Sequence, residues 1–299
     1  MTMKLIDFMG KRRIAYVISI LLTIIAIGSL ATRHLNLGLD FTGGTIVQVH
    51  FDRQPDLEQV RETIAKAGYP NPTVQAGGTT QDAQIRMQVD YTDNIGQKIA
   101  AVISSSDNAA HVVSANFIGS QVGDQLSNQG GKGLLYALIG IMIYLALRFQ
   151  WKFALGAVLA LAHDVLIVIG IFSIFHLEFD LTVMAGVLAV LGYSLNDTIV
   201  VYDRIRENIR TSRSHDIVQI CNDAINQTLA RTIATSGTTL LALCALYTMG
   251  GEMLHNFSLA LIFGVVLGTF SSIYVAAALL VLFKLRRSDL TKPQHDSTP

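Results

Sequence analysis

The sequence predicts an α-helical integral membrane protein whose membrane part is interrupted by one folded hydrophilic domain. Three observations predict this fold class. Only 15% of the 299 residues are charged, and the mean hydropathy is +0.45, whereas soluble domains carry about 25% charged residues. Six apolar stretches are each long enough to cross a bilayer. A single hydrophilic block, residues 36–132, separates the first stretch from the second.

The six predicted transmembrane helices have the length that a bilayer requires, roughly 17–25 predominantly apolar residues. They are residues 14–35, 133–149, 153–175, 181–202, 233–249 and 257–283. Basic residues precede the first helix, and Ser29-Leu30-Ala31 has the small-x-small form of a signal cleavage site. The apolar core is longer than the ~7–15 residues of a cleaved signal, so we predict a retained anchor.

Lysine and arginine are distributed unevenly between the two sides of the predicted membrane. They gather in residues 1–13, at Arg148 and Lys152 between the second and third stretches, in 203–232 and in 284–299. The two opposite short loops, 176–180 and 250–256, contain none. Because positively charged loops stay in the cytoplasm, we predict that both termini are cytoplasmic. The block 36–132 then faces the outside.

The hydrophilic block is predicted to fold as strand, helix, strand, strand, helix, strand. The strands alternate apolar and polar residues, and the helices carry one apolar face. The predicted strands are 45–51, 73–77, 83–89 and 111–118, and the predicted helices are 55–67 and 93–103. This βαββαβ order is the ferredoxin-like α+β arrangement. The segment Gly130–Gly133 is predicted to be a flexible joint between this domain and the second helix.

Several function classes find no support in the residues. Gly130-Gly131-Lys132-Gly133 lacks the spacing of a phosphate-binding loop. No His/Cys cluster has metal-ligand spacing, and no Ser/His/Asp set can be argued, so we predict neither an enzyme nor a cofactor nor a metal. Lys+Arg and Asp+Glu are both 22, so net charge indicates no nucleic-acid partner. We expect the energy for any work to come from a gradient or a partner protein.

One carboxyl, Asp197, lies inside the apolar fourth stretch, 181–202. A charged carboxylate in a bilayer costs at least ~2.5–3.5 kcal/mol on insertion scales, so such a residue usually lines an interior path or binds something. Burial also disfavours the charged form, which makes protonation accessible near neutral pH. We predict that Asp197 carries protons; a fixed ion pair or an interhelical hydrogen bond is the simpler alternative. A sodium ion would want roughly six oxygens, more than one carboxyl offers.

Other polar residues accompany Asp197 in the predicted spans. Arg231 opens the fifth span and is either a counter-charge to Asp197 or an ordinary basic flank. Hydroxyls after it can hydrogen-bond across helices or hold water. The candidate supporting residues are Asn196, Thr235, Ser236 and Thr239.

Two further features lie in the third and sixth spans. His163 and Asp164 are adjacent near the middle of the third span. Neighbouring side chains on a helix point about 100° apart, so we expect no pairing between them. One of them is predicted to face the Asp197 helix, with structural hydrogen bonding as the alternative. In the sixth span Gly264, Gly268 and Ser271-Ser272 form a small-residue face that predicts close helix packing.

The loop 203–232 contains two charged or amphipathic segments. Asp203, Arg206, Glu207 and Arg210 form an i,i+3/i+4 ladder typical of a solvated helix end. Residues 216–229 place apolar side chains at helical spacing. We predict for them a short amphipathic helix that lies on the membrane surface.

Four stretches resemble the SecF family, the smaller subunits of the SecD–SecF complex of bacterial protein export. They are GLDFTGGT at 38–45, ALAHDV at 160–165, GYSLNDTIVVYDRIREN at 192–208 and RTIATSGTT at 231–239. The resemblance covers almost the whole chain. It assigns the family's membrane aspartate to Asp197, its arginine to Arg231, and a signature next to the first span to Asp40, Phe41, Gly43 and Gly44.

The resemblance implies a function and partners. It implies a half-transporter of the resistance–nodulation–division superfamily in the cell inner membrane, paired with SecD. Such proteins use the proton-motive force to assist late export of unfolded polypeptides through SecYEG. YajC and the insertase YidC are further implied partners. Two alternatives stay open: an autonomous efflux pump that works without SecD, and a passive scaffold for translocon subunits.

Overall fold

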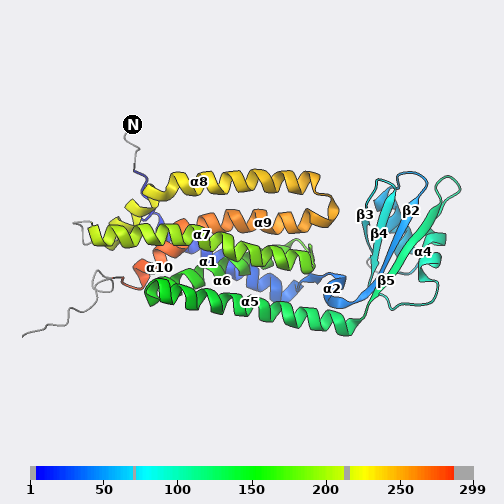
Figure 1. The fold of residues 1–299 in the computed structure, drawn as a ribbon, viewed down its shortest axis with the longest axis horizontal. Helices are drawn as coiled ribbons and strands as arrows, with labels where there is room; N and C mark the ends of the chain where they lie inside the picture. The colour runs from blue at the N-terminus through cyan, green and yellow to red at the C-terminus, as the bar shows by residue number, and fades with distance from the viewer. Residues whose placement is uncertain (1–4, 70–71, 212–215, 286–299) are drawn as a thin grey trace, which may run out of the picture.

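The computed structural model describes residues 5–69, 72–211 and 216–285, with the side chains of 252 and 253 excepted. The molecule is elongated, with a helix bundle at one end and a small sheet domain at the other (Figure 1). The predicted tail 284–299 lies almost entirely outside the described residues, as does the start of the predicted N-terminal segment 1–13.

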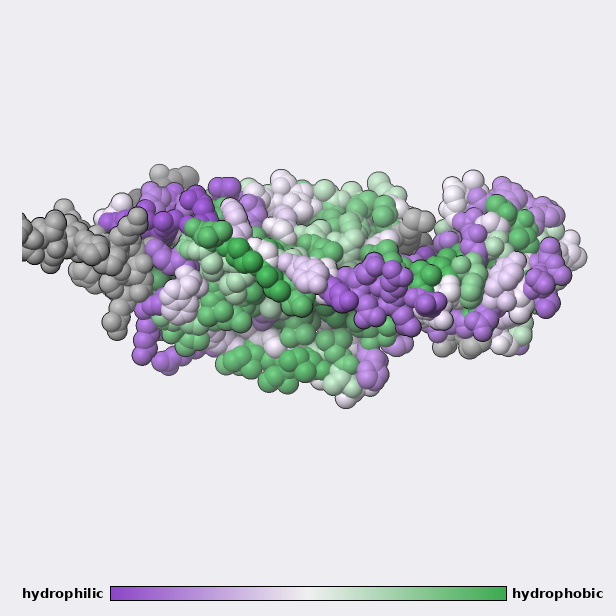
Figure 2. Space-filling view, turned by 60° about the horizontal axis from the view of Figure 1, so that its bottom comes forward, coloured by the Kyte–Doolittle hydropathy of each residue, from purple (hydrophilic) through white to green (hydrophobic). Residues whose placement is uncertain are grey.

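Six helices in the described part of the chain are long and apolar enough to cross a membrane, as predicted. The first five are α1 (Arg12–Arg33), α5 (Ser120–Arg148), α6 (Trp151–Ile174), α7 (Leu181–Thr211) and α8 (Ile217–Met249). The sixth is continuous but changes pitch, through α9 (Glu252–Phe270), the π-helical η1 (Ser271–Ala276) and α10 (Ala277–Leu282). On the face drawn in Figure 2, apolar residues cover the middle of the bundle, and hydrophilic residues gather toward its two ends. The chain is therefore a multi-pass membrane protein.

The second span does not begin after a flexible joint. The sequence predicts a joint at Gly130–Gly133, but α5 is helical from Ser120 onward. Two glycines of this helix serve close packing instead: a Cβ on Gly123 would lie 2.6 Å from the carbonyl oxygen of Phe41, and one on Gly130 would lie 2.1 Å from the Met184 sulfur. Gly123 and Gly130 therefore allow neighbouring segments to approach α5, while Gly131 and Gly133 have open space beside them.

The predicted amphipathic surface helix 216–229 is also not separate. It is the first half of α8, and α7 extends past the predicted end of its span to Thr211. Its apolar face is buried in the core, against Tyr202, Ile205 and the N-terminal residues Phe8 and Met9. The face consists of Ile220, Cys221, Ala224 and Ile225. This segment therefore belongs to the bundle and does not lie on lipid.

The sheet domain, Gly44–Ile118, has the predicted order of elements. These are β2 (Gly44–Phe51), α3 (Leu57–Lys66), β3 (Thr73–Ala76), β4 (Asp82–Met87), α4 (Ile95–Ile103) and β5 (Ala110–Ile118). The strand order is β3-β4-β2-β5 and every pair is antiparallel. Side chains of α3 and α4, such as Ile64 and Ile99, pack on Val47 and Ile85 of the sheet. Two helices therefore cover one face.

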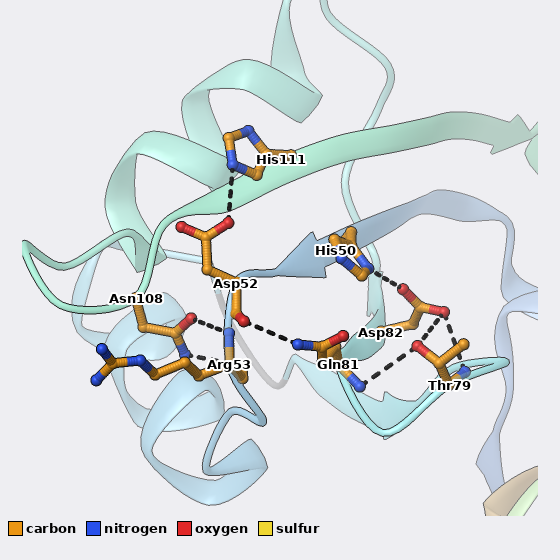
Figure 3. A network of polar contacts seen from close by, with 8 residues as sticks. All are labelled: His50, Asp52, Arg53, Thr79, Gln81, Asp82, Asn108 and His111. Carbon is orange, nitrogen blue, oxygen red and sulfur yellow. Dashed lines mark hydrogen bonds and ion pairs between the residues drawn. The ribbon is translucent and has the colours of Figure 1, made fainter.

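A polar network joins the loops at the end of the sheet domain where β2 ends (Figure 3). His50 Nδ1 lies 2.6 Å from Asp82 Oδ1, and Asp82 Oδ2 accepts hydrogen bonds from Thr79 N and Oγ1. The hydrogen bonds from His50 and Thr79 lower the pKa of Asp82. On the neighbouring strand pair, His111 Nε2 lies 3.3 Å from Asp52 Oδ1. The network holds the β3–β4 turn and the end of β2 together.

Candidate functional site

Asp197 lies on α7 and is only 3% exposed. Its polar partner on the facing helix α8 is Ser236, whose Oγ is 3.5 Å from Asp197 Oδ2. Ser236 itself is 5% exposed. Since the normal range for such a bond is about 2.5–3.0 Å, this is a long and weak hydrogen bond. Asp197 is therefore a buried carboxyl whose hydrogen bond to the facing helix is weak.

Ser236 connects Asp197 to two further hydroxyls. Its Oγ lies 2.7 Å from Thr269 Oγ1 on α9, and Tyr193 on α7 donates to it at 3.3 Å. Thr269 Oγ1 in turn donates to the carbonyl oxygen of Val265 at 2.7 Å. The predicted supporting residue Ser236 is thus the centre of a hydroxyl chain across three helices. Sequence reasoning missed Thr269, because a single threonine in an apolar span gives no signal.

Arg231 is exposed and lies on α8, five residues before Ser236. In the described part of the chain no ion pair within 4.0 Å joins Arg231 to Asp197. Arg231 instead lines a cavity of about 380 Å³ at the end of the bundle away from the sheet domain. Arg148, Asp203, Arg204 and Glu207 also line this cavity.

The other predicted supporting residues of α7 and α8 are not gathered around Asp197. Asn196 is exposed on α7. Thr235 Oγ1 donates to carbonyl oxygens of its own helix, those of Arg231 and Thr232, at 3.0 Å. Thr239 follows one turn later and is half-buried. An exposed amide within a span presents hydrogen-bonding groups outward from this chain.

Asp164 forms a second polar centre, in the middle of α6, and is fully buried. Its Oδ2 accepts hydrogen bonds from Ser194 Oγ of α7 at 2.7 Å and from Ser271 Oγ of η1 at 2.6 Å. His163 Nδ1 lies 3.0 Å from its Oδ1. The expectation that His163 and Asp164 do not pair is therefore wrong. The imidazole and carboxyl side chains are long enough to bridge the roughly 100° between adjacent positions on a helix.

The two centres share the same helices. Ser194 is one turn before Asp197 on α7, and Thr269 is two residues before Ser271 in the sixth span. Small residues bring these helices together, as predicted, since a Cβ on Gly264 would lie 2.0 Å from Val190 and one on Gly268 would lie 2.9 Å from Ser194. The two sets of polar groups are therefore held by the same packed helices, α6, α7, α8 and the sixth span.

The signature next to the first span connects bundle and sheet domain. The helix α2 (Leu39–Thr42) contains Asp40 and the buried Phe41, and Asp40 Oδ2 accepts a hydrogen bond from Leu181 N at the start of α7 at 3.1 Å. Gly43 and Gly44 follow with φ of 75° and 142°. A Cβ on Gly44 would lie 2.4 Å from the carbonyl oxygen of Met87. Both the backbone conformation and the close approach require glycine here.

A second connection joins the sheet domain to the α6–α7 loop. β1 (Asn36–Leu37) pairs in parallel with β6 (Glu178–Phe179). Arg86 of β4 forms an ion pair with Glu178 at 3.3 Å, and both side chains are largely buried. Burial raises the pKa of Glu178, while the nearby Arg86 opposes that shift. Sequence reasoning missed this pair because its partners are separated by 92 positions.

The fold and the site define a class: a helical membrane protein with six candidate spans, one extramembrane domain and carboxyls buried in the bundle. Comparison with protein families narrows the class. Residues 98–286 match the family model described as protein export membrane protein SecD/SecF, C-terminal, and residues 28–55 match the SecD/SecF GG motif. The second match contains Asp40–Gly44. The chain belongs to the SecD/SecF family of protein export membrane proteins.

Named relatives are similar over nearly their whole length. Protein translocase subunit SecF of Pseudomonas aeruginosa is 48% identical over 98% of this chain and 96% of the relative. The SecF subunits of Vibrio alginolyticus and Escherichia coli O157:H7 are each 43% identical, over 97% and 96% of this chain and 94% and 90% of the relatives.

Solved structures of SecDF have the same fold. The crystal structure of SecDF from Thermus thermophilus, described as a translocon-associated membrane protein, superposes with a TM-score of 0.82 at 35% identity. A structure of SecDF in a super-membrane-facing form gives 0.73 at 34% identity. Each covers 94% of this chain, and this chain spans 39% of each SecDF chain.

Proposed function

We propose that this chain is a SecF-like, non-enzymatic subunit that works with SecD and uses the proton-motive force to assist late protein export through SecYEG. The observation that carries the proposal is Asp197, a buried carboxyl held by one long hydrogen bond in a span of a SecD/SecF-family protein. A buried ionisable group in a membrane span usually serves transport.

The pairing with SecD is supported by this chain's own surface and by its relatives. The solved SecDF chains contain a region like this one within a longer polypeptide, and Asn196 presents an exposed amide in a span. A polar group is costly against lipid, so a partner helix is the favourable neighbour. YajC and YidC are proposed as further partners on the family resemblance alone.

The proposed location is the bacterial inner membrane, with both termini in the cytoplasm and the sheet domain in the periplasm. The excess of Lys and Arg at the end of the bundle away from the sheet domain supports this orientation. The sheet domain is proposed to be ferredoxin-like, because its element order is βαββαβ and its helices cover one face. We propose that it contacts the emerging unfolded polypeptide.

The hydroxyl chain provides a mechanism for coupling. When Asp197 is protonated, it donates to Ser236, Ser236 donates to Thr269, and Thr269 donates to the carbonyl oxygen of Val265. When Asp197 is ionised, Ser236 must donate to it, so Thr269 turns toward Ser236 and leaves Val265. A hydroxyl has one proton to donate, so the direction of the whole chain reverses with the charge of Asp197.

The energy available suits a switch between two arrangements of the helices. One charge moved across 100 mV is worth ~2.3 kcal/mol, which is comparable to a coupling free energy between two sites. We propose that protonation of Asp197 shifts the helices of the bundle relative to one another. The shift is then transmitted to the sheet domain through Asp40–Gly44 and the Arg86–Glu178 ion pair.

The test is export from spheroplasts that carry Asp197→Asn. We expect release of a secreted protein to lose its dependence on the membrane potential, because an amide keeps the shape of the side chain but cannot exchange the proton. The matched control is Asp124→Asn, an exposed carboxyl on α5, which should behave as the unmodified protein. Unchanged release with Asp197→Asn would refute the proposed proton role.

Two rival functions make different predictions. An autonomous efflux pump should be purified without SecD, whereas our proposal predicts SecD at about one copy per copy of this chain after mild detergent extraction. A passive scaffold should tolerate Asp197→Asn but fail when helix packing at Gly264 or Gly268 is disrupted. Export and co-purification of the same variants separate the three functions.

A further inference from the structure

Apart from Asp197 and the hydroxyls linked to it, the bundle contains a pair of ionisable side chains that the proposed mechanism does not use, His163 and Asp164. Asp164 is fully buried and accepts hydrogen bonds from Ser194 and Ser271, at 2.7 and 2.6 Å. With His163 Nδ1 at 3.0 Å, three donors surround its two oxygens. All three groups can donate to an ionised carboxylate, which only accepts hydrogen bonds, and Ser271 Oγ also lies 3.2 Å from the carbonyl oxygen of Gly268.

The geometry also assigns the proton of His163. Its Nε2 is buried and has no hydrogen-bond partner among the described residues. A proton on Nε2 would therefore be a buried donor without an acceptor, which costs about 1–3 kcal/mol. With the proton on Nδ1, the neutral ring instead donates to the Asp164 carboxylate, whereas the other tautomer would turn a lone pair toward it. This leaves a lone pair on Nε2 and a net charge of −1 on the pair.

A net negative charge at the centre of a bundle attracts a proton. We propose that His163 and Asp164 form a second proton-binding site, in which Asp164 orients the ring and His163 Nε2 accepts the proton. The inference deepens the proposed coupling function and rests on it for the role of the bound proton. Hydronium transfers one proton to Nε2 and leaves water, and the pair becomes an imidazolium–carboxylate ion pair with no net charge.

Other ionisable groups near the pair are few. The elements packed against α6 are α1, α5, α7, α9, η1 and α10. Away from the ends of these helices, the described ionisable side chains are the carboxyl of Asp197, Lys132 of α5 and six tyrosines: Tyr16, Tyr136, Tyr144, Tyr193, Tyr202 and Tyr274. Lys132, the one cation among them, is exposed. His163, at 3.0 Å from Asp164, is therefore the described group placed to balance the charge of that carboxyl.

The bound proton is expected to change the arrangement of the sixth span. Protonated Nε2 carries an N–H that lacks an acceptor in the present arrangement, so another arrangement of the helices becomes favourable. Asp164 is bonded to Ser271, the first residue of the π-helical segment, and Tyr202 donates to the carbonyl oxygen of Ala276 at its other end, at 3.0 Å. Single π-helical turns often occur at functional sites, and conversion of this one to α-helix would shift the sixth span.

The test is nuclear magnetic resonance of the full chain, co-purified with SecD in lipid nanodiscs, with ¹⁵N-labelled histidine. His163→Gln identifies the His163 signals among the eight histidines. At high pH we expect a neutral ring protonated at Nδ1, and acidification should add a second proton at Nε2. A neutral ring protonated at Nε2, or no second protonation on acidification, would overturn the inference.

Two variants distinguish a proton-binding pair from a structural contact. Asp164→Asn should lower the titration midpoint of His163 by about one pH unit, a tenfold loss of proton affinity, because the negative partner is removed. Ser271→Ala should raise the midpoint, because the carboxylate loses a donor that stabilises its charge. If neither variant moves the midpoint, the pair is structural. These outcomes do not depend on export, so failure of the Asp197→Asn export test leaves them intact.

Discussion

Asp164 and Asp197, the two described carboxyls buried within the spans, have different surroundings. Asp164 is held by three polar groups at 2.6–3.0 Å, whereas Asp197 is approached by one hydroxyl at 3.5 Å. Short, numerous hydrogen bonds hold a carboxylate and its neighbours in place, while a single long one leaves protonation and movement open. In the proposed mechanism, Asp164 therefore organises the centre of the bundle, and Asp197 is the carboxyl whose contact is broken and remade.

The largest expected difference between the two carboxyls is in stability. Asp164→Ala leaves three buried donors without their acceptor, so we expect the free energy of unfolding to fall by at least ~1–3 kcal/mol. Asp197→Ala removes one long contact and should cost less than about 1 kcal/mol. Reversible unfolding in bicelles measures both. Equal losses would show that the two environments are energetically alike.

The next effect concerns the close contact between α7 and α9, the helices that carry polar groups of both sites. Gly264→Ala would place a Cβ 2.0 Å from Val190, and overpacking of this kind costs about 1–3 kcal/mol. The matched control is Gly237→Ala on α8, where nothing lies within 4 Å of the added Cβ. We expect the control to keep or slightly raise the unfolding free energy, measured in the same bicelles. A harmless Gly264→Ala would contradict the close approach of α7 and α9.

A smaller effect is expected from the hydroxyl chain at Asp197. Ser236→Ala removes the hydrogen bond that the described residues offer the Asp197 carboxyl, and the link to Thr269. The loss of one hydrogen bond, about 0.5–1.5 kcal/mol, should reduce potential-dependent export by roughly 2- to 10-fold. Thr238→Ala is the control, since Thr238 Oγ1 donates only to carbonyl oxygens of its own helix. Equal export by both variants would mean that the chain plays no part.

The smallest effects come from two carboxyls outside the membrane, Glu178 and Asp82. Their contributions to the unfolding free energy change with pH in opposite directions. Burial raises the pKa of Glu178 above its usual 4.5, so the unfolding free energy should fall as pH rises from about 4.5 through the folded value. The pKa of Asp82 is lowered from 3.8, so its contribution is present above about 3.8 and is lost as pH falls through the folded value. Unfolding midpoints of Glu178→Gln and Asp82→Asn across this pH range should each lose the corresponding slope. A variant that keeps the slope of the unmodified protein shows that another group causes it.

The sequence by itself determined the class of the protein. Apolar runs such as those now seen in α1 and α6 predict spans because length and hydropathy are local properties. The order of strands and helices in the sheet domain followed from alternation and amphipathic spacing for the same reason. Asp197 stood out because a lone carboxyl in an apolar run is costly, wherever the neighbouring helices lie.

Only the tertiary structure decided which polar groups meet. Ser194 and Ser271 are 77 positions apart, and no local pattern indicates that both donate to Asp164. The close contact of Gly130 with Met184 of α7 was likewise decided by packing, since glycine alone is compatible with a joint or with a close contact. Side-chain hydrogen bonds act across helices at distances below about 3 Å, and a sequence specifies such distances only after the helices have packed.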